Sequence, residues 1–123
     1  MLAKGLTHTS QTVVNENNTA IALGSGDMKV LATPAMIALM ENAAMLCVAP
    51  HLPEGSTTVG SMISSSHIKP SAIRANVEAT AELVEIENRK LTFKVTATEN
   101  GELIGEGTHI RYIVDRERFL SKL

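Results

Sequence analysis

The fold of this chain depends on one stretch, TPAMIALMENAAMLCVAP, which runs from Thr33 to Pro50. Thr33 is a favourable N-cap, and Pro34 suits the first helical position, where a missing N–H costs nothing. Pro50 disfavours helical backbone in the residue before it, so the pattern predicts one helix between the two prolines. Because nearly every residue between them is apolar, this helix has no polar face, and we expect it to be buried all round.

Glu41 is the single charged residue in this predicted helix, and Asn42 stands beside it. A carboxylate in a buried helix is costly unless it is paired or has a chemical use. Glu41 can therefore be read as one half of a structural pair across a dimer interface. It can also be read as a catalytic group, because carboxyl groups with perturbed pKa values cluster at functional sites.

The composition describes a small protein with an aliphatic core. The chain has 123 residues, 44% of them apolar, and its three aromatic residues are Phe93, Tyr112 and Phe119. We expect one domain, residues 1–123, whose core is rich in Met or is completed by a partner subunit. The net charge is −2 and the basic residues are scattered, unlike the basic face of a nucleic-acid-binding protein.

Metal sites, disulfides and membrane insertion are not expected. Cys47 is the single cysteine, and no cluster of His, Cys and carboxylate residues has the spacing of metal ligands. The N-terminus, MLAKG, lacks the apolar core of a signal peptide. Glu41 and Asn42 divide the apolar helix into runs shorter than a membrane span. These features predict a soluble, cytoplasmic protein that uses no metal.

Strands are predicted on both sides of the helix. Residues 7–14 and 19–23 read as strands joined by a turn, and residues 115–123 as a short helix capped by Asp115. Four further strands are predicted after the long helix, at Ser56–Ile68, Ala75–Leu83, Leu91–Ala97 and Leu103–Val114. This order predicts an α+β fold, in which a mostly antiparallel sheet wraps around one long buried helix.

Details of the predicted strands support this arrangement. Apolar and polar residues alternate with period two in residues 75–83 and 91–97, so one face of each strand should point to the core. Asn100-Gly101 is a strong hairpin signal, since both central residues of a type I′ turn need positive φ. Gly105 and Gly107 indicate the close approach of another backbone or of a ligand.

A set of motifs extends from about Val30 to Phe119. They are VLATPAM at residues 30–36, Glu41, Ala49-Pro50, Gly60, His67 and GTHIR at residues 107–111. Together they resemble the fluoroacetyl-CoA thioesterase-like family, which has the hotdog fold. The spacings from Thr33 to Glu41 and from Glu41 to His67 also fit that family's catalytic triad of Thr, Glu and His.

The resemblance implies an acyl-CoA thioesterase that acts as a homodimer or a dimer of dimers. Its substrate would be a short acyl-CoA thioester, with no cofactor apart from the CoA of the substrate. Thr33, Glu41 and His67 fall on the catalytic positions, and Gly60 and Arg111 fall on substrate-binding positions. The fluoroacetyl-specific members carry a Phe-bearing lid where this chain has the short loop 24–30, so the resemblance does not extend to that selectivity.

Each proposed catalytic residue has more than one possible role. Glu41 could attack the thioester carbonyl to form an anhydride, or it could deprotonate a water molecule. His67 could act as a general acid or base near neutral pH. Thr33 could hold the carboxylate, a water molecule or the developing oxyanion at the helix start, where free N–H groups could receive the thioester oxygen.

Other residues keep a structural interpretation. The remaining histidines, His8, His51 and His109, are read as surface or satisfied residues, although His109 shares the strand of Arg111. Arg111 itself could be a solvated strand charge. Four scattered basic residues could meet CoA phosphates, although such residues usually serve solubility; they are Lys69, Arg74, Arg89 and Lys90.

Two other functions remain open on the same fold. One is a CoA-linked hydratase or dehydratase, which would use a different acid–base pair with Glu41 as the partner of a histidine. The other is a non-enzymatic dimer that binds acyl-CoA. Thiol release from acyl-CoAs, water addition to an enoyl-CoA, and binding without either reaction separate the three.

The geometry of a helix constrains how the site is assembled. Thr33 and Glu41 are eight residues apart, which on a continuous helix is about 12 Å of rise and about 80° of rotation. Side chains so placed cannot reach hydrogen-bond distance, near 3 Å. Either the helix begins later than Pro34 and Thr33 folds back over it, or the site combines Thr33 of one chain with Glu41 of another. We favour the second arrangement.

Overall fold

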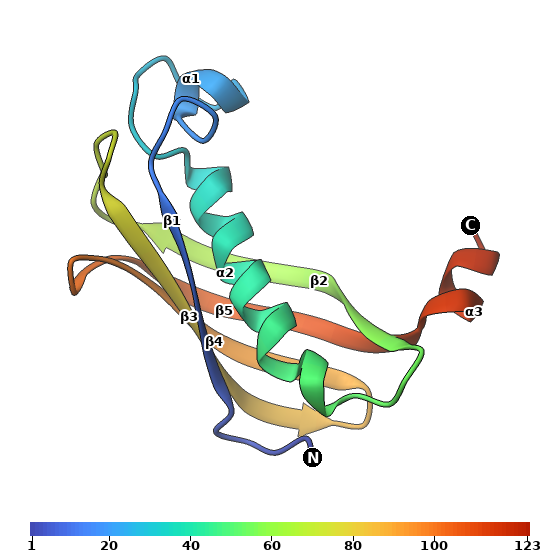
Figure 1. Ribbon diagram of the computed structural model, residues 1–123. Helices are drawn as coiled ribbons and strands as arrows, with labels where there is room; N and C mark the ends of the chain where they lie inside the picture. The colour runs from blue at the N-terminus through green and yellow to red at the C-terminus, as the bar shows by residue number, and fades with distance from the viewer.

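The computed structural model describes residues 1–123 and shows a curved antiparallel sheet packed on one long helix (Figure 1). The strands are β1 (Thr7–Val13), β2 (Ser56–His67), β3 (Asn76–Glu87), β4 (Lys90–Glu99) and β5 (Glu102–Asp115). The helical elements are α1 (Ala20–Leu23), α2 (Thr33–Val48), the 3₁₀ turn η1 (Ala49–His51) and α3 (Arg116–Ser121). The strand order is β1-β3-β4-β5-β2, with every neighbouring pair antiparallel. This confirms the predicted α+β arrangement.

The core lies between the concave face of the sheet and one side of α2. The period-two alternation is confirmed, because the inward residues of β3 and β4 are fully buried: Val77, Ala79, Ala81, Leu83, Leu91, Phe93, Val95 and Ala97. α2 contributes six buried side chains, Met36, Met40, Ala43, Ala44, Cys47 and Val48. In this chain the core is thus aliphatic and Met-rich around a single phenylalanine.

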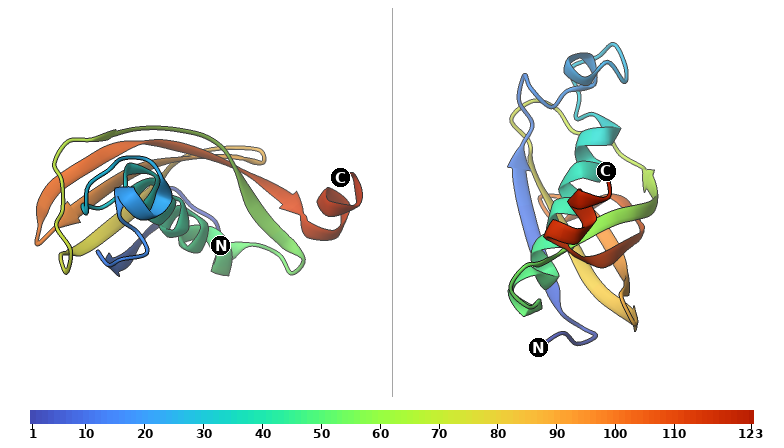
Figure 2. Two further views of the ribbon diagram at one scale, coloured as in Figure 1. Left: turned by 90° about the horizontal axis from the view of Figure 1, so that it is seen from above. Right: turned by 90° about the vertical axis from the view of Figure 1, so that its right-hand side faces the viewer.

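The prediction that α2 is buried all round is wrong for a single chain. Ala38, Asn42 and Leu46 are exposed on the side of α2 that faces away from the sheet. Figure 2 shows the reason, since the sheet curves over one side of the helix and leaves the other side open. The same views show α3 extending beyond the sheet at the end of β5.

The strand predicted at residues 19–23 is also wrong. Thr19 instead caps the short helix α1, because its Oγ1 accepts a hydrogen bond from the Ala22 N–H at 3.2 Å. Gly24 ends α1 with a φ of 72°, a conformation that favours glycine. Thr19 forms one isolated bridge, and its partner is Leu31 rather than a residue of β1, which pairs with β3.

The ends of α2 differ slightly from the prediction. Ala32 is the N-cap and Thr33 is the first helical residue, so no side chain caps the helix and the Thr33 hydroxyl is free to bond elsewhere. At the other end, α2 stops at Val48, and Pro50 lies inside the turn η1. The Asp115 cap of α3 is confirmed, since its Oδ1 accepts from the Arg118 N–H at 2.9 Å.

By length and composition, residues Thr33–His51 could cross a membrane, which differs from the expectation based on Glu41 and Asn42. One such helix is a weak indication, because the core helix of a soluble protein meets the same criteria. Here six side chains of α2 are buried within the molecule.

The glycine and hairpin predictions are confirmed. Asn100 and Gly101 both have positive φ, 51° and 81°, at the turn between β4 and β5. A Cβ on Gly107 would overlap the Ser64 carbonyl oxygen, and one on Gly105 would lie 2.5 Å from Met36 Sδ. These two glycines let β5 approach both β2 and α2 closely, which sets the position of the site residues on both elements.

Candidate active site

Thr33 and His67 meet at the start of α2. Thr33 is the first residue of α2, and His67 is the last residue of β2. Their side chains are hydrogen-bonded, with 2.8 Å between Thr33 Oγ1 and His67 Nδ1, although they are 34 residues apart in the sequence. A pocket of about 260 Å³ lies beside them, lined by Ala20, Ser25, Val30, Leu31, Thr33, His67, Ile68, Lys69 and Pro70.

The His67 imidazole is suited to accept a proton. Burial lowers its pKa, and the nearby Lys69 backbone opposes this shift only in part. The ring is therefore neutral at neutral pH. Its Nε2 is buried and has no hydrogen-bond partner in the chain. A buried polar atom left unpaired costs free energy, so Nε2 is available to a substrate, a water molecule or another polypeptide.

The start of α2 offers fewer free amides than expected. Pro34 has no N–H, and the amides of Ala35 and Met36 both donate to the Ala32 carbonyl at 3.0 Å. The Thr33 hydroxyl is thus the most prominent polar group at this end of the helix. Its position beside the helix start still favours negative charge.

A second cluster forms around Gly60 of β2, next to Glu41 in the middle of α2. Gly60 lies opposite Arg111 in the β2–β5 pair, where β2 has a bulge between Gly60 and Met62. A Cβ on Gly60 would lie 3.2 Å from Glu41 Oε2, 3.3 Å from His109 Cε1 and 3.4 Å from an Arg111 terminal nitrogen. Glycine therefore leaves room where these three side chains converge.

The pocket at this second cluster is open and has a volume of about 470 Å³. Its lining residues are Ala38, Glu41, Asn42, Met45, Thr58, Val59, Gly60 and Arg111. The Glu41 carboxylate is one of two charged groups in this lining, and the other is the Arg111 guanidinium. The predicted substrate-binding residues Gly60 and Arg111 thus lie beside Glu41.

Arg111 is buried rather than solvated, with 8% of its surface exposed. Its Nε donates to Thr58 Oγ1 at 2.8 Å, and one terminal nitrogen donates to the Thr58 carbonyl at 3.0 Å. The other terminal nitrogen donates to His109 Nε2 at 3.2 Å. Burial lowers the pKa of Arg111, and the negative charge of Glu41 opposes this shift. Thr58 therefore fixes a buried cation next to Glu41.

His109 also belongs to this cluster, and the sequence analysis did not predict a site role for it. The ring is fully buried, and its Nδ1–H donates to the Met62 carbonyl at 2.7 Å. Burial lowers the pKa of His109, Arg111 lowers it further, and the Met62 carbonyl and Glu41 act in the opposite direction. Its position in the sequence could have indicated this role, since His109 lies two residues before Arg111 and residues i and i+2 of a strand share a face.

The chain brings the predicted site residues together in two groups, not one. Thr33 pairs with His67, while Glu41 lies with Gly60 and Arg111, and the two pockets share no lining residue. α2 is continuous from Thr33 to Val48, so the alternative in which the helix begins later than Pro34 is wrong. No group of three or more His, Cys, Asp or Glu side chains is placed to hold a metal ion.

Comparison with known proteins gives a consistent result. A family model described as fluoroacetyl-CoA-specific thioesterase matches residues 14–117. The chain is 36% identical to the fluoroacetyl-CoA thioesterase of Streptantibioticus cattleyicolor over 95 residues, which are 77% of this chain and 68% of the relative. A solved structure of the fluoroacetyl-CoA thioesterase FlK aligns with a TM-score of 0.93 and 31% identity, covering 99% of this chain and 95% of that one.

A more distant structure supports the fold alone. The hot-dog-like protein of Thermanaerovibrio acidaminovorans aligns with a TM-score of 0.88 at 18% identity, covering 97% of this chain and 88% of the other. The predicted hotdog fold is thereby confirmed.

Proposed function

This chain belongs to the fluoroacetyl-CoA-specific thioesterase family, and from this premise we propose that it hydrolyses a short acyl-CoA thioester. In this proposal Thr33, Glu41 and His67 are the catalytic residues, and Gly60 and Arg111 bind the substrate. The observation that carries it is the 2.8 Å hydrogen bond between Thr33 and His67. It joins two residues of the family triad that lie 34 positions apart in the sequence.

Glu41 reacts with the thioester, and its surroundings suit that role. The fixed charge of Arg111 stabilises an anionic carboxylate or the oxyanion that forms when the carbonyl is attacked. The open pocket that Gly60 and Glu41 line receives the acyl group. Glu41 either attacks the thioester carbonyl, so that CoA leaves as its thiolate and water then hydrolyses the resulting anhydride, or takes a proton from a water molecule that attacks the carbonyl as CoA thiolate leaves. Rapid-quench mass spectrometry separates these routes, because only the first leaves an acyl adduct on Glu41.

The catalytic residues come from two copies of the chain. Within one chain, Glu41 and the Thr33–His67 pair lie on separate pockets of the same helix. The exposed side of α2, at Ala38, Asn42 and Leu46, provides a face that a second copy covers. The unpaired His67 Nε2 then has a partner, since Glu41 of the second copy can approach it. Sedimentation that shows a stable, active monomer at micromolar concentration contradicts this assembly.

The activity is tested by thiol release from a panel of acetyl-, fluoroacetyl-, butyryl- and aromatic acyl-CoAs. We expect release from the short acyl-CoAs, with no strong preference for fluoroacetyl-CoA over acetyl-CoA. The matched control is Glu41→Gln, which keeps the shape of the side chain and removes its charge. Binding of acyl-CoA without thiol release would support a binding protein, and water addition to an enoyl-CoA would support a hydratase.

Sharing of the site is tested with tagged heterodimers of the wild-type chain and a Thr33→Val/Glu41→Gln double variant. If each site combines residues of two chains, both sites of this heterodimer lack one catalytic residue, and its activity falls far below half of the wild-type value. If both residues act within one chain, the wild-type chain keeps one intact site. Half of the wild-type activity per heterodimer would therefore refute the shared site. Heterodimers of the two single variants should give the opposite pattern, because a shared site leaves one intact site in them whereas an intrachain site leaves none.

A further inference from the structure

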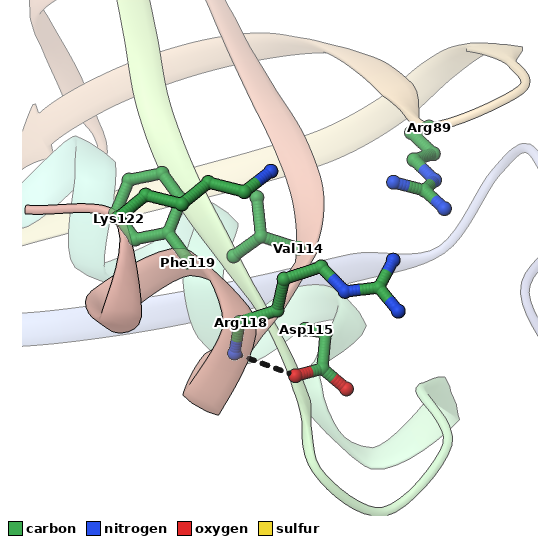
Figure 3. A pocket seen from close by; sticks show the side chains of 6 residues that line it. All are labelled: Arg89, Val114, Asp115, Arg118, Phe119 and Lys122. Carbon is green, nitrogen blue, oxygen red and sulfur yellow. Dashed lines mark hydrogen bonds between the residues drawn. The ribbon is translucent and has the colours of Figure 1, made fainter.

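Three cationic side chains gather at the C-terminal end of the molecule, outside the site described above. Arg89 comes from the turn between β3 and β4, and Arg118 and Lys122 come from α3 and the residue after it. We call these three residues the C-terminal basic cluster. They line a pocket of about 110 Å³ together with Val114, Asp115 and Phe119 (Figure 3).

The charges of the C-terminal basic cluster are not neutralised within the chain. The ion pairs of the chain are Lys29–Glu16 and Lys69–Glu102, neither of which involves the cluster. Asp115 is the single carboxylate in the pocket lining, and it accepts the Arg118 backbone N–H. The chain as a whole carries a net charge of −2, so this excess of positive charge is local. Such a patch attracts a multiply charged anion.

The chemistry of the pocket suits a nucleotide that carries phosphates. Guanidinium groups bind phosphate oxygens through paired, charge-assisted hydrogen bonds, and a lysine supplies a further point charge. Phe119 is 39% exposed in the same pocket and offers an aromatic face for a purine ring. Arg118 and Lys122 are four residues apart, so they lie on one side of the chain as it leaves α3.

An apolar pocket joins the C-terminal basic cluster to the pocket of Glu41. It has a volume of about 310 Å³ and is lined by Met45, Thr57, Thr58, Val59, Val114, Arg116, Phe119 and Leu120. It shares Val114 and Phe119 with the basic cluster pocket. It shares Met45, Thr58 and Val59 with the Glu41 pocket. The three pockets therefore form one continuous track along the end of β2, β5 and α3.

The length of this track matches an extended thioester arm. Arg111 and Asp115 are four residues apart in β5, which corresponds to about 13 Å of strand. A pantetheine arm can cover such a distance between a thioester carbonyl and the first phosphate of CoA. Along the track, the Glu41 carboxylate is followed by the apolar pocket and then by the three cations of the C-terminal basic cluster. This is the order that the thioester, the arm and the phosphates of an acyl-CoA require.

We propose that the C-terminal basic cluster binds the phosphorylated adenosine end of the acyl-CoA substrate, with Phe119 against the adenine. This inference rests on the proposed thioesterase function. It assigns the nucleotide to the same chain that supplies Glu41, whichever chain supplies Thr33 and His67. The cluster takes no part in the chemical step, so its loss should raise KM and leave kcat unchanged.

The test compares wild-type protein with an Arg118→Gln/Lys122→Gln double variant on two substrates, acetyl-CoA and acetyl-pantetheine. The second substrate has the same thioester and arm but no phosphate. We expect kcat/KM for acetyl-CoA to fall about 5- to 30-fold in the variant, the scale of two partly exposed charge contacts. For acetyl-pantetheine, kcat/KM should not change. A Lys4→Gln/Lys94→Gln variant removes the same charge at exposed sites outside all of these pockets and serves as the control.

A binding measurement tests the inference independently of enzyme activity. Calorimetry with 3′-phosphoadenosine 5′-diphosphate, the nucleotide half of CoA, should show binding that weakens with added salt and is lost in the α3 variant but not in the control. Equal nucleotide binding by wild type and variant, or an equal fall in kcat/KM for both substrates, would overturn the inference. Hydrolysis of neither substrate by the wild type would instead refute the thioesterase function, and nucleotide binding would still decide the role of the cluster.

Discussion

The same helix carries two clusters that are built in opposite ways. At its start, the Thr33–His67 pair consists of neutral groups joined by one hydrogen bond, with a buried imidazole nitrogen left open. In its middle, Glu41 faces the buried guanidinium of Arg111, which makes two hydrogen bonds to Thr58 and one to His109. The first cluster is adapted to moving a proton, and the second to holding charge. Each cluster lacks what the other supplies, and the proposed active site combines the two.

The largest effect is expected from removing the negative charge of Glu41, in the second cluster. Glu41→Gln should lower kcat by about 10⁴-fold or more, because the proposed reacting group is lost. The fold should persist, since a neutral amide is less costly to bury than a carboxylate. Thiol release and thermal melting measure the two effects. Activity within a few-fold of wild type in a folded variant would show that Glu41 is structural.

Removing the proton-transfer group of the first cluster should have the next largest effect. His67→Ala should lower the rate by roughly 10²–10⁴-fold. Because burial lowers the pKa of His67, the neutral form predominates above its lowered pKa and is lost as the pH falls through that value. In the wild type, kcat/KM should therefore decline on an acidic limb that lies below the usual histidine value of 6.5.

This acidic limb should be absent in His67→Ala, which a pH–rate profile measures. His8→Ala is the matched control, because His8 lies on β1 away from both pockets. If the limb persists unchanged in His67→Ala, another group is the base, and the contrast between the two clusters would fail.

The hydrogen bond within the first cluster should matter less than its histidine. Thr33→Val removes the hydroxyl while keeping the branched shape, and we expect about a 10-fold loss of kcat. Thr33→Ser should retain most of the activity. In a His67→Ala background, Thr33→Val should add little further loss, because the two residues act as a unit. Additive losses would mean that Thr33 acts on the substrate independently of His67.

The smallest effect is expected from loosening the support of Arg111. Thr58→Val removes the Oγ1 that accepts from Arg111 Nε but keeps the backbone carbonyl contact. KM should rise about 3- to 10-fold, since one charge-assisted hydrogen bond is lost, with kcat nearly unchanged. Thr92→Val, on β4 and outside the lining of these pockets, is the control. A fall in kcat larger than the rise in KM would place Arg111 in the chemical step.

The fold could be predicted because its signals are local. A long apolar segment bounded by two prolines gave α2, and alternating residues gave the core faces of β3 and β4. The segment at residues 19–23 was predicted wrongly because four apolar residues suit either state. A helix forms there because the Thr19 side chain caps its start and Gly24, in the left-handed conformation, ends it.

The site was predictable in part. Helix geometry alone separated Thr33 from Glu41, and the resemblance to a family located Gly60 and Arg111. The sequence could not show that Thr33 bonds His67, because that contact depends on where β2 ends relative to α2. It also could not show that Arg111 is buried, since a buried cation requires the acceptors that Thr58 and His109 supply across the β2–β5 pair.

The strand order has a consequence for how the chain folds during synthesis. β2 precedes β3 and β4 in the sequence, yet its partner in the sheet is β5, the last strand made. When α2 leaves the ribosome, β1 is the one strand of the sheet that has already been made. The apolar side of the helix therefore stays exposed until the other four strands are synthesised. Closing the sheet then requires pairing residues that lie 38 (His67 and Gly105) to 59 (Ser56 and Asp115) positions apart, which slows folding and leaves an aggregation-prone intermediate exposed. A nascent chain stalled before β5 should therefore bind holding chaperones, whereas one that includes β5 should release them.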